Sequence, residues 1–220
     1  MKQLFIIEGS EYTGKSSLLM SLAKTYENSI TTNEPGGTPF GMDIRSLLKG
    51  TEGLNNLTYL FGMFASRVEN VERVIVPYLY KGNIVLTDRF DLSTYAYQVL
   101  YNNINLKDLF LMCREHTFGA MFKEQGIECN YILLDVDPKV AAERKAIAVG
   151  DRSFLDGEGD QIEAKYSNLN ALRNAYRKAL DDFTDMGFTT QETTCVVDTS
   201  DLTQEQVLER VVEFINKRVA

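Results

Sequence analysis

The stretch IIEGSEYTGKSSLL, from Ile6 to Leu19, decides the fold of this chain. It begins inside an apolar run that starts at Leu4, and such a run is typical of a short buried strand. Gly9 to Ser16 then fit the pattern G-x-x-x-x-G-K-[S/T], and Ser17 to Lys24 have the apolar spacing of a helix. Strand, loop and helix in this order are the setting in which the pattern binds phosphate, so we predict a nucleotide triphosphate site here.

The residue types in this loop each have a chemical reason to be there. The glycines let backbone N–H groups turn toward an anion, and the helix N-terminus adds partial positive charge. Lys15 is expected to reach the β- and γ-phosphates, and the Ser16 hydroxyl is expected to ligate Mg²⁺. The residues predicted to bind ATP are Gly9, Ser10, Tyr12, Thr13, Gly14, Lys15, Ser16 and Ser17.

The composition disfavours several classes of protein. The chain has 220 residues, of which 44% are hydrophobic, enough to bury the core of one α/β domain. We see no signal peptide and no apolar stretch long enough to span a bilayer, so no membrane partner is expected. The formal charge of −8 disfavours nucleic-acid binding. The three scattered cysteines are typical of reduced thiols in a cytoplasmic protein.

Strand-like runs alternate with helical periodicity along the whole chain. This alternation predicts an α/β P-loop NTPase fold of three layers, with a central parallel sheet of about five strands flanked by helices. No repeat or linker divides the chain, so we expect one domain, 1–220. The expected strands are Leu4–Glu8, Ile30–Thr32, Asn83–Thr87, Tyr131–Val136 and Thr194–Val197.

The clearest helical pattern runs from about Asn56 to Tyr80. Its apolar stripe suits a core or an interface between chains, and the sequence leaves both open. Arg67 lies off this stripe, and its position alone predicts an ordinary solvated arginine. The stripe consists of Leu57, Leu60, Phe61, Phe64, Val68, Val71, Ile75 and Tyr78.

Two further strand ends carry unusual residues. In α/β sheets, ligands bind beyond the carboxyl ends of the strands. NEPGGTPFGMDIRSLL, Asn33 to Leu48, follows the second strand, and DRFDLSTYAYQ, Asp88 to Gln98, follows the third. Gly36 and Gly37 permit close backbone approach, and Thr38 or Pro39 can open a helix that carries Arg45.

Here the sequence resembles a known family, the thymidylate kinases, in their bacterial and viral branch and over nearly the whole length. The P-loop is common to many enzymes, whereas E-P-G-G-T together with D-R-F and S-T-x-A-Y-Q is far more specific. The resemblance rests on EGSEYTGKSS (8–17), EPGGTPFGMDIRSLL (34–48), FASRVENV (64–71), TDRFDLSTYAYQ (87–98) and LLDVDPKVAAER (133–144).

The resemblance implies a role for each matching residue. Arg45 and Arg89 would hold the acceptor's phosphate. Glu11 would lie near the acceptor and near the ligands of the magnesium ion. Asp88 would lie with Ser16 on the side of the site that binds the metal. Arg67 would contact the thymine edge. The remaining acceptor residues would be Phe40 in the nucleoside pocket, and Ser93, Thr94, Tyr97 and Gln98 around the base and sugar.

The resemblance also implies the reaction ATP + dTMP ⇌ ADP + dTDP with Mg²⁺, in one P-loop kinase domain that family members usually assemble into a homodimer. A phosphate acceptor needs no strong base, which suits a chain with one histidine. A kinase of broader deoxynucleotide specificity stays open. A deoxynucleoside kinase is less favoured. Members of that family carry the motif E-x-W at the second strand, and this chain has no tryptophan. A nucleotide-binding module without turnover ranks lowest.

This chain departs from the family pattern at two places. Family members supply an arginine for the transferring phosphoryl group from the P-loop or from a lid, and this P-loop has none. We therefore expect it from the lid, around 144–160, whose candidates are Arg144 and Arg152. The polar stretch 150–160 inside it is either a mobile lid or a plain surface loop. The catalytic residues are then Glu11, Lys15, Arg89, Arg144 and Arg152.

The second departure lies at the base. The family places a phenylalanine four residues before the arginine that contacts thymine, and here that position is Met63. Met63 and Arg67 share a helix face because they are four residues apart. We therefore predict that Met63 covers the base and that Phe64 belongs to the core.

Overall fold

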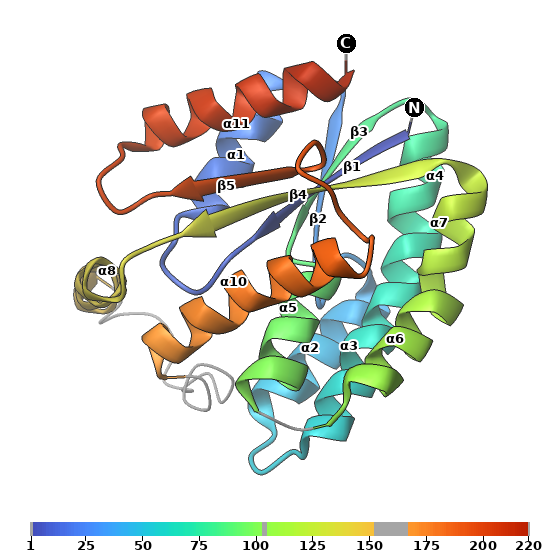
Figure 1. The fold of residues 1–220 in the computed structure, drawn as a ribbon, viewed down its shortest axis with the longest axis horizontal. Coiled ribbons are helices and arrows are strands. Elements are labelled where there is room, and N and C mark those ends of the chain that lie inside the picture. Colours follow the sequence, from blue (N-terminus) through green and yellow to red (C-terminus); the bar gives the residue numbers. More distant parts are fainter. Residues whose placement is uncertain (1, 103–104, 152–166, 220) are drawn as a thin grey trace.

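The chain forms three layers, a parallel sheet with helices on both faces (Figure 1). This is a computed structural model, and it describes residues 2–102, 105–151 and 167–219. The sheet has five strands in the order β2-β3-β1-β4-β5. Their bounds are β1 Lys2–Glu8, β2 Ser29–Asn33, β3 Ile84–Asp88, β4 Ile127–Asp135 and β5 Thr194–Asp198. The predicted α/β fold and its five strands are confirmed.

Helices fill the intervals between the strands. The α-helices are α1 Lys15–Thr25, α2 Pro39–Gly50, α3 Asn56–Asn70, α4 Val76–Tyr80, α5 Asp91–Thr94, α6 Lys107–Arg114, α7 Ala120–Gln125, α8 Pro138–Asp151, α10 Leu169–Asp185 and α11 Gln204–Val219. Three π-helical segments, Val71–Ile75, Tyr95–Tyr101 and Glu115–Gly119, continue α3, α5 and α6. None of the helices within the described ranges has the length and apolar character that crossing a lipid bilayer requires.

The two faces of β1 build two hydrophobic cores, because side chains alternate along a strand. Phe5 and Ile7 pack with α1 and α11 on one side, and Leu4 and Ile6 pack with α3, α6 and α10 on the other. Figure 1 shows α1 and α11 together over one face of the sheet.

Strand β4 begins earlier than the sequence indicated. The expected start was Tyr131, and the strand starts at Ile127, where it pairs with Lys2 of β1. Glu128 and Cys129 are only half-buried, so this part of the strand lacks the continuous apolar run on which the prediction relied.

The predicted helix from Asn56 to Tyr80 is α3, a π-helical segment and α4 in succession. Its stripe is not uniformly buried, however. Leu60 and Phe64 lie in the core, whereas Leu57 is 44% exposed and Phe61 is 52% exposed. The two exposed residues are four positions apart, so they lie on the same side of the helix.

All strands point the same way, so their carboxyl ends meet at one edge of the sheet. The register pairs Ile7 with Asp88 of β3, Glu8 with Leu133 of β4, and Asn33 of β2 with Asp88. The segments that the sequence singled out therefore leave the sheet side by side.

Candidate functional site

The phosphate loop lies between β1 and α1, as predicted. Gly9 has φ 140°, and a Cβ there would come within 2.3 Å of the Leu134 carbonyl oxygen, so only glycine fits. The Lys15 Nζ donates to the Ser10 carbonyl at 2.6 Å, and the Thr13 hydroxyl donates to the same oxygen at 3.1 Å. Burial, with Arg89 nearby, lowers the pKa of Lys15 from 10.5 to about 8. The loop therefore holds a desolvated cation beside its own backbone.

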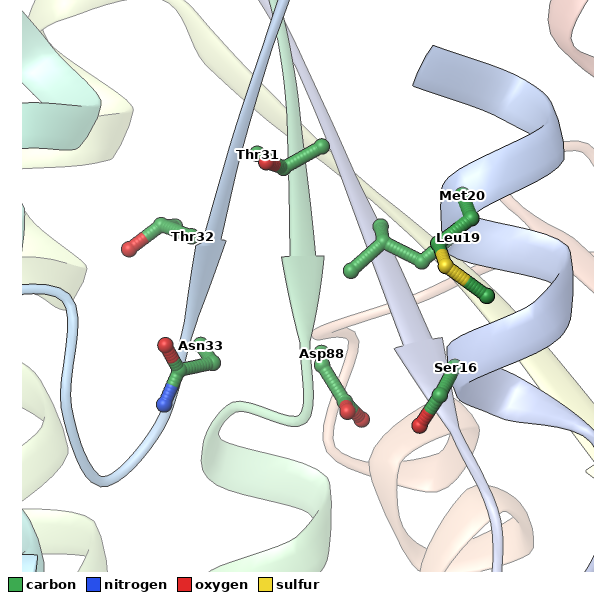
Figure 2. A pocket seen from close by; sticks show the side chains of 7 residues that line it. All are labelled: Ser16, Leu19, Met20, Thr31, Thr32, Asn33 and Asp88. Carbon is green, nitrogen blue, oxygen red and sulfur yellow. The ribbon is translucent and has the colours of Figure 1, made fainter. Parts of the chain in front are cut away.

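Ser16 and Asp88 line one pocket, between α1 and the ends of β2 and β3 (Figure 2). Their side-chain oxygens lie at the same end of that pocket, with Asn33 across from them. The Asp88 Oδ1 is buried and accepts no hydrogen bond from any described residue. Within the described ranges no three His, Cys, Asp or Glu side chains gather as a metal cluster. A hydroxyl and a carboxylate with a spare oxygen suit a hard cation that also takes phosphate and water oxygens.

Arg89 comes directly after β3 and lies at the centre of the site. It has φ 67°, a left-handed conformation that is uncommon for a side chain of this size. Its Nη2 forms an ion pair with Glu11, and its Nη1 donates to the Gly9 carbonyl at 3.2 Å and the Tyr97 hydroxyl at 3.3 Å. Arg89 lowers the pKa of Glu11 from 4.5 to about 2, outweighing the opposite effect of burial. A fixed guanidinium thus lies next to the phosphate loop.

Tyr176 of α10 completes this cluster, and the sequence did not single it out. Its hydroxyl accepts from Arg89 Nη1 at 2.5 Å and lies 2.7 Å from the Ser93 hydroxyl. Tyr176 lies four residues after Leu172 and four before Leu180, so its position looked like that of any core residue of an amphipathic helix. No local signal distinguishes it.

Glu8, the last residue of β1, is a second residue that the sequence did not assign. Its carboxylate is completely buried and accepts from the backbone N–H groups of Phe90 at 2.8 Å and Ser93 at 3.2 Å, and from the Ser93 hydroxyl. It therefore pins the loop that carries Arg89. Burial raises the pKa of Glu8 to about 7, although the Ser93 hydrogen bond and Arg89 act in the opposite direction.

This shifted pKa predicts a pH dependence of stability. A folded-state pKa raised from 4.5 to about 7 stabilises the fold fully below pH 4.5, and that contribution is lost as pH rises through 7. We expect the melting temperature of the unliganded chain to fall between pH 5 and pH 8, and the fall to be smaller in Glu8→Gln. Calorimetry across this range measures it, with the exposed Glu27→Gln as control. Equal slopes in the wild type and Glu8→Gln would contradict the prediction.

Arg67 corrects the expectation of a solvated arginine, because it is one of the largest completely buried side chains among the described residues. Its Nε pairs with Glu34 Oε2 at 2.5 Å, and its Nη2 donates to the Phe90 carbonyl and the Thr94 hydroxyl, each at 2.9 Å. Position on the helix could not reveal this, since the partners come from the segments that follow β2 and β3.

The other predicted acceptor residues differ in their surroundings. Arg45 donates from Nη1 to the Pro35 carbonyl at 3.1 Å, from the helix that Thr38 caps as predicted. Phe40 is 47% exposed. Met63 is half-buried, whereas Phe64 is buried with its ring centroid 5.7 Å from that of Phe110. Among the remaining predicted residues, Gln98 is also buried.

The first turns of the predicted lid lie in α8. Arg144 of this helix donates from Nη1 to the Tyr12 carbonyl at 3.2 Å and from Nη2 to the Thr199 carbonyl at 2.6 Å. It is therefore beside the phosphate loop. Arg152 lies outside the described residues, as does the rest of the predicted lid up to 160.

Comparisons with known proteins point in one direction. The sequence model of one family, described as "Thymidylate kinase", matches residues 7–210. A thymidylate kinase of Protochlamydia amoebophila is 30% identical over 228 residues, covering 96% of this chain and 91% of that protein. A thymidylate kinase of Vibrio parahaemolyticus is 38% identical over 153 residues, covering 66% and 70%.

The fold also has a solved counterpart. The crystal structure of thymidylate kinase from Ehrlichia chaffeensis superposes with a TM-score of 0.67, at 22% identity, over 98% of both chains. At this identity the likeness concerns the fold, and it agrees with the order of strands and helices described above.

Proposed function

Because this chain belongs to the thymidylate kinase family, we propose that it transfers the γ-phosphoryl group of ATP to dTMP, giving ADP and dTDP. The observation that carries the proposal is the position of Arg89. Its Nη1 contacts the Gly9 carbonyl of the phosphate loop and also the Ser93 and Tyr97 hydroxyls of the segment after β3. A cation held between a donor loop and an acceptor segment suits transfer from one phosphate to another.

The acid–base groups support a phosphate acceptor over a hydroxyl acceptor. A hydroxyl needs a base with a pKa near neutrality within reach, and Glu11 is a poor base because its pKa is about 2. Glu8 has a pKa of about 7, but it is completely buried and its carboxylate already accepts three hydrogen bonds. A phosphate oxygen is nucleophilic without a base, so positioning and charge neutralisation suffice.

The residues at the pocket of Figure 2 are proposed to hold Mg²⁺. Ser16 and Asp88 provide the oxygen ligands, and the unpartnered Asp88 Oδ1 supports this assignment. When bound, the ion would neutralise charge on the phosphate oxygens. The chain's own contribution is to fix Ser16 at the start of α1 and Asp88 at the end of β3.

A coupled ADP-release assay tests the proposed function. The acceptors are dTMP, dUMP, dCMP, dGMP and dAMP, with thymidine as the hydroxyl acceptor. We expect turnover with dTMP and none with thymidine. Turnover with another acceptor but not with dTMP would overturn the proposal, and turnover with several would establish broader specificity.

We propose that the lid supplies the arginine for the transferring group. Arg144 supports this, since its guanidinium lies against the phosphate loop. Arg144→Ala or Arg152→Ala is expected to lower kcat by about 10²-fold or more, because such an arginine stabilises charge only as transfer proceeds. Steady-state kinetics measures this, with the exposed Lys139→Ala of α8 as a charge-matched control. Near wild-type kcat in both variants would rule out a lid arginine.

A homodimer is proposed through the outer faces of α3 and α6. Phe61 and Leu57 of α3 and Met112 of α6 are exposed apolar side chains, and the two helices are neighbours (Figure 1). Phe61→Glu is expected to give a monomer in sedimentation equilibrium, because burying an unpaired carboxylate opposes association. Tyr80→Glu, at a somewhat more exposed apolar position on α4, should remain dimeric. A monomeric wild type would contradict the dimer.

A cytoplasmic location is also proposed. The thiols of Cys113, Cys129 and Cys195 are all free, which suits a reducing compartment.

A further inference from the structure

A buried polar network joins the end of β2 to helix α3. Glu34, only 3% exposed, accepts from Arg67 through Oε2 and from Asn70 Nδ2 through Oε1 at 3.1 Å. Asn70 in turn accepts from the Thr32 hydroxyl at 2.7 Å. Each carboxylate oxygen of Glu34 therefore already accepts a hydrogen bond from α3.

The segment after β2 is shaped around this network. A Cβ on Gly37 would lie 2.3 Å from the Asn70 Oδ1 and 2.4 Å from the Thr32 hydroxyl oxygen, so the backbone rests directly on the pair. The Gly36 N–H donates to the Ser66 hydroxyl at 3.0 Å, and this hydrogen bond braces the same segment without using the Arg67 guanidinium. This close fit leaves Glu34 little freedom to move.

The hydrogen bonds of Arg67 leave one nitrogen unused. The guanidinium has five N–H donors, one on Nε and two on each terminal nitrogen. Glu34 takes Nε, and the Phe90 carbonyl and Thr94 hydroxyl take both protons of Nη2. The Nη1 is buried and has no hydrogen-bond partner in the described part of the chain. A buried donor without a partner is unfavourable, so an acceptor oxygen that reached it would be strongly favoured.

Two aromatic rings hold the plane of this guanidinium, in addition to the hydrogen bonds that its nitrogens donate. Its carbon lies 5.0 Å from the centroid of the Phe64 ring and 4.9 Å from that of Phe90. Phe90 and Thr94 also adjoin Arg89 and Ser93 in the chain, so the guanidinium lies against the segment that carries the predicted acceptor residues.

We propose that Glu34 is the positioning residue that sets base selectivity, by holding Arg67 so that only the unpartnered Nη1 is left to donate to the acceptor base. The inference rests on the proposed function, because it concerns which nucleotide the acceptor site takes. A rigid N–H donor can donate a hydrogen bond to the keto oxygen at C4 of thymine or uracil. At the same position cytosine carries an amino group, which leaves two donors facing each other and both unsatisfied. A site built to make a hydrogen bond rejects the analogue that cannot make it far more strongly than an apolar pocket does.

Glu34→Gln is the sharpest test. Glutamine keeps the shape, but its single oxygen cannot accept from both Arg67 and Asn70 at the separate positions that the carboxylate serves. Arg67 is then free to turn. Glu34→Asp is the second variant, in case Glu34→Gln folds poorly, because it keeps the charge and withdraws it from Nε. Ser66→Ala is the matched control. It removes the hydrogen bond from the Gly36 N–H, which braces the same segment but does not use the Arg67 guanidinium.

Dissociation constants for dTMP, dUMP and dCMP are measured by titration calorimetry, with displacement of dTMP for the weak ligands. In Glu34→Gln we expect the dTMP preference over dCMP to fall at least about tenfold. The preference for dTMP over dUMP should stay within about twofold, because both bases carry the same keto oxygen. Ser66→Ala should leave both ratios at wild-type values. Melting curves confirm that each variant is folded.

The outcomes separate this inference from the proposed function. A wild type that does not phosphorylate dTMP overturns the proposed function and the inference with it. A wild type active on dTMP, with an unchanged dTMP-to-dCMP ratio in folded Glu34→Gln, overturns the inference alone. Equal weakening of all three nucleotides does the same, because it means that Glu34 only supports the fold.

Discussion

A Lys15→Met variant is expected to lose at least about 10³-fold in kcat/KM while its unliganded fold becomes more stable. We expect this loss because Lys15 is the cation of the phosphate loop, and its charge is proposed to act on the group being transferred. Mutations that remove one preorganised donor to developing charge typically lower kcat by about 10²–10³-fold, and weaker ATP binding adds to this.

The gain in stability follows from the pKa of Lys15. Burial lowers that pKa to about 8, so at pH 7 the fold must hold a charged ammonium in a place that disfavours charge. This penalty is present below pH 8 and disappears as pH rises toward 10.5, the ordinary value. Methionine removes the charge and keeps the length of the side chain. After subtracting the lost hydrogen bond to Ser10, a gain of roughly 1–3 kcal/mol is expected at pH 7.

Denaturant unfolding and steady-state kinetics on the same preparation measure both effects. Lys24→Met, on the exposed side of the same helix, is the control for the loss of one positive charge. The opposite signs matter, because a variant that lost activity through misfolding would also lose stability. Reduced stability in Lys15→Met would contradict the claim that the ammonium is held at a cost.

The sequence predicted those features whose causes are local. The phosphate loop was visible because strand, glycines and helix are consecutive, and α2 began where Thr38 and Pro39 indicated. The alternation of strands and helices predicted a parallel sheet of about five strands, but it did not predict their order. Because the strands of such a sheet are parallel, a common edge for Asp88 and Asn33 was still foreseeable.

Residues that act through distant partners were not foreseeable. Tyr176 is 87 residues from Arg89 in the chain, and Glu34 is 33 residues from Arg67. Each sits in a pattern that also suits an ordinary core helix or loop. Glu8 looked like the polar end of a strand, and only its burial among Phe90 and Ser93 donors shows that it holds the Arg89 loop.

Two clusters of charge in the structure illustrate the same limit. Arg89 and Arg67 are both stabilised by carboxylates from other elements, Glu11 and Glu34. The net charge of −8 gave no hint of where cations gather. The tertiary structure brings each arginine to its carboxylate, and both arginines then lie beside the same segment, 90–94. This segment links the part of the site proposed to hold the acceptor's phosphate with the part proposed to hold its base.

The remaining large effect concerns Phe64, whose truncation to alanine is expected to destabilise the fold by about 3–5 kcal/mol. Phe64 is 3% exposed, its ring packs against Phe110, and it lies beneath the Arg67 guanidinium. Alanine leaves a cavity that rigid neighbours on α6 cannot fill. For a chain of this size the melting temperature should fall by roughly 6–20 °C.

Met63→Ala is the paired variant, and it should behave in the opposite way. Met63 is only half-buried and shares a helix face with Arg67, four residues on. If its thioether covers the base, a sulfur–aromatic contact of roughly 0.3–1.5 kcal/mol is lost, and KM for dTMP rises while the melting temperature stays nearly constant. Thermal melts and dTMP kinetics on both variants decide the matter. A Phe64→Ala variant that melts like the wild type but no longer binds dTMP would make Phe64 the residue that covers the base, with Met63 merely beside it.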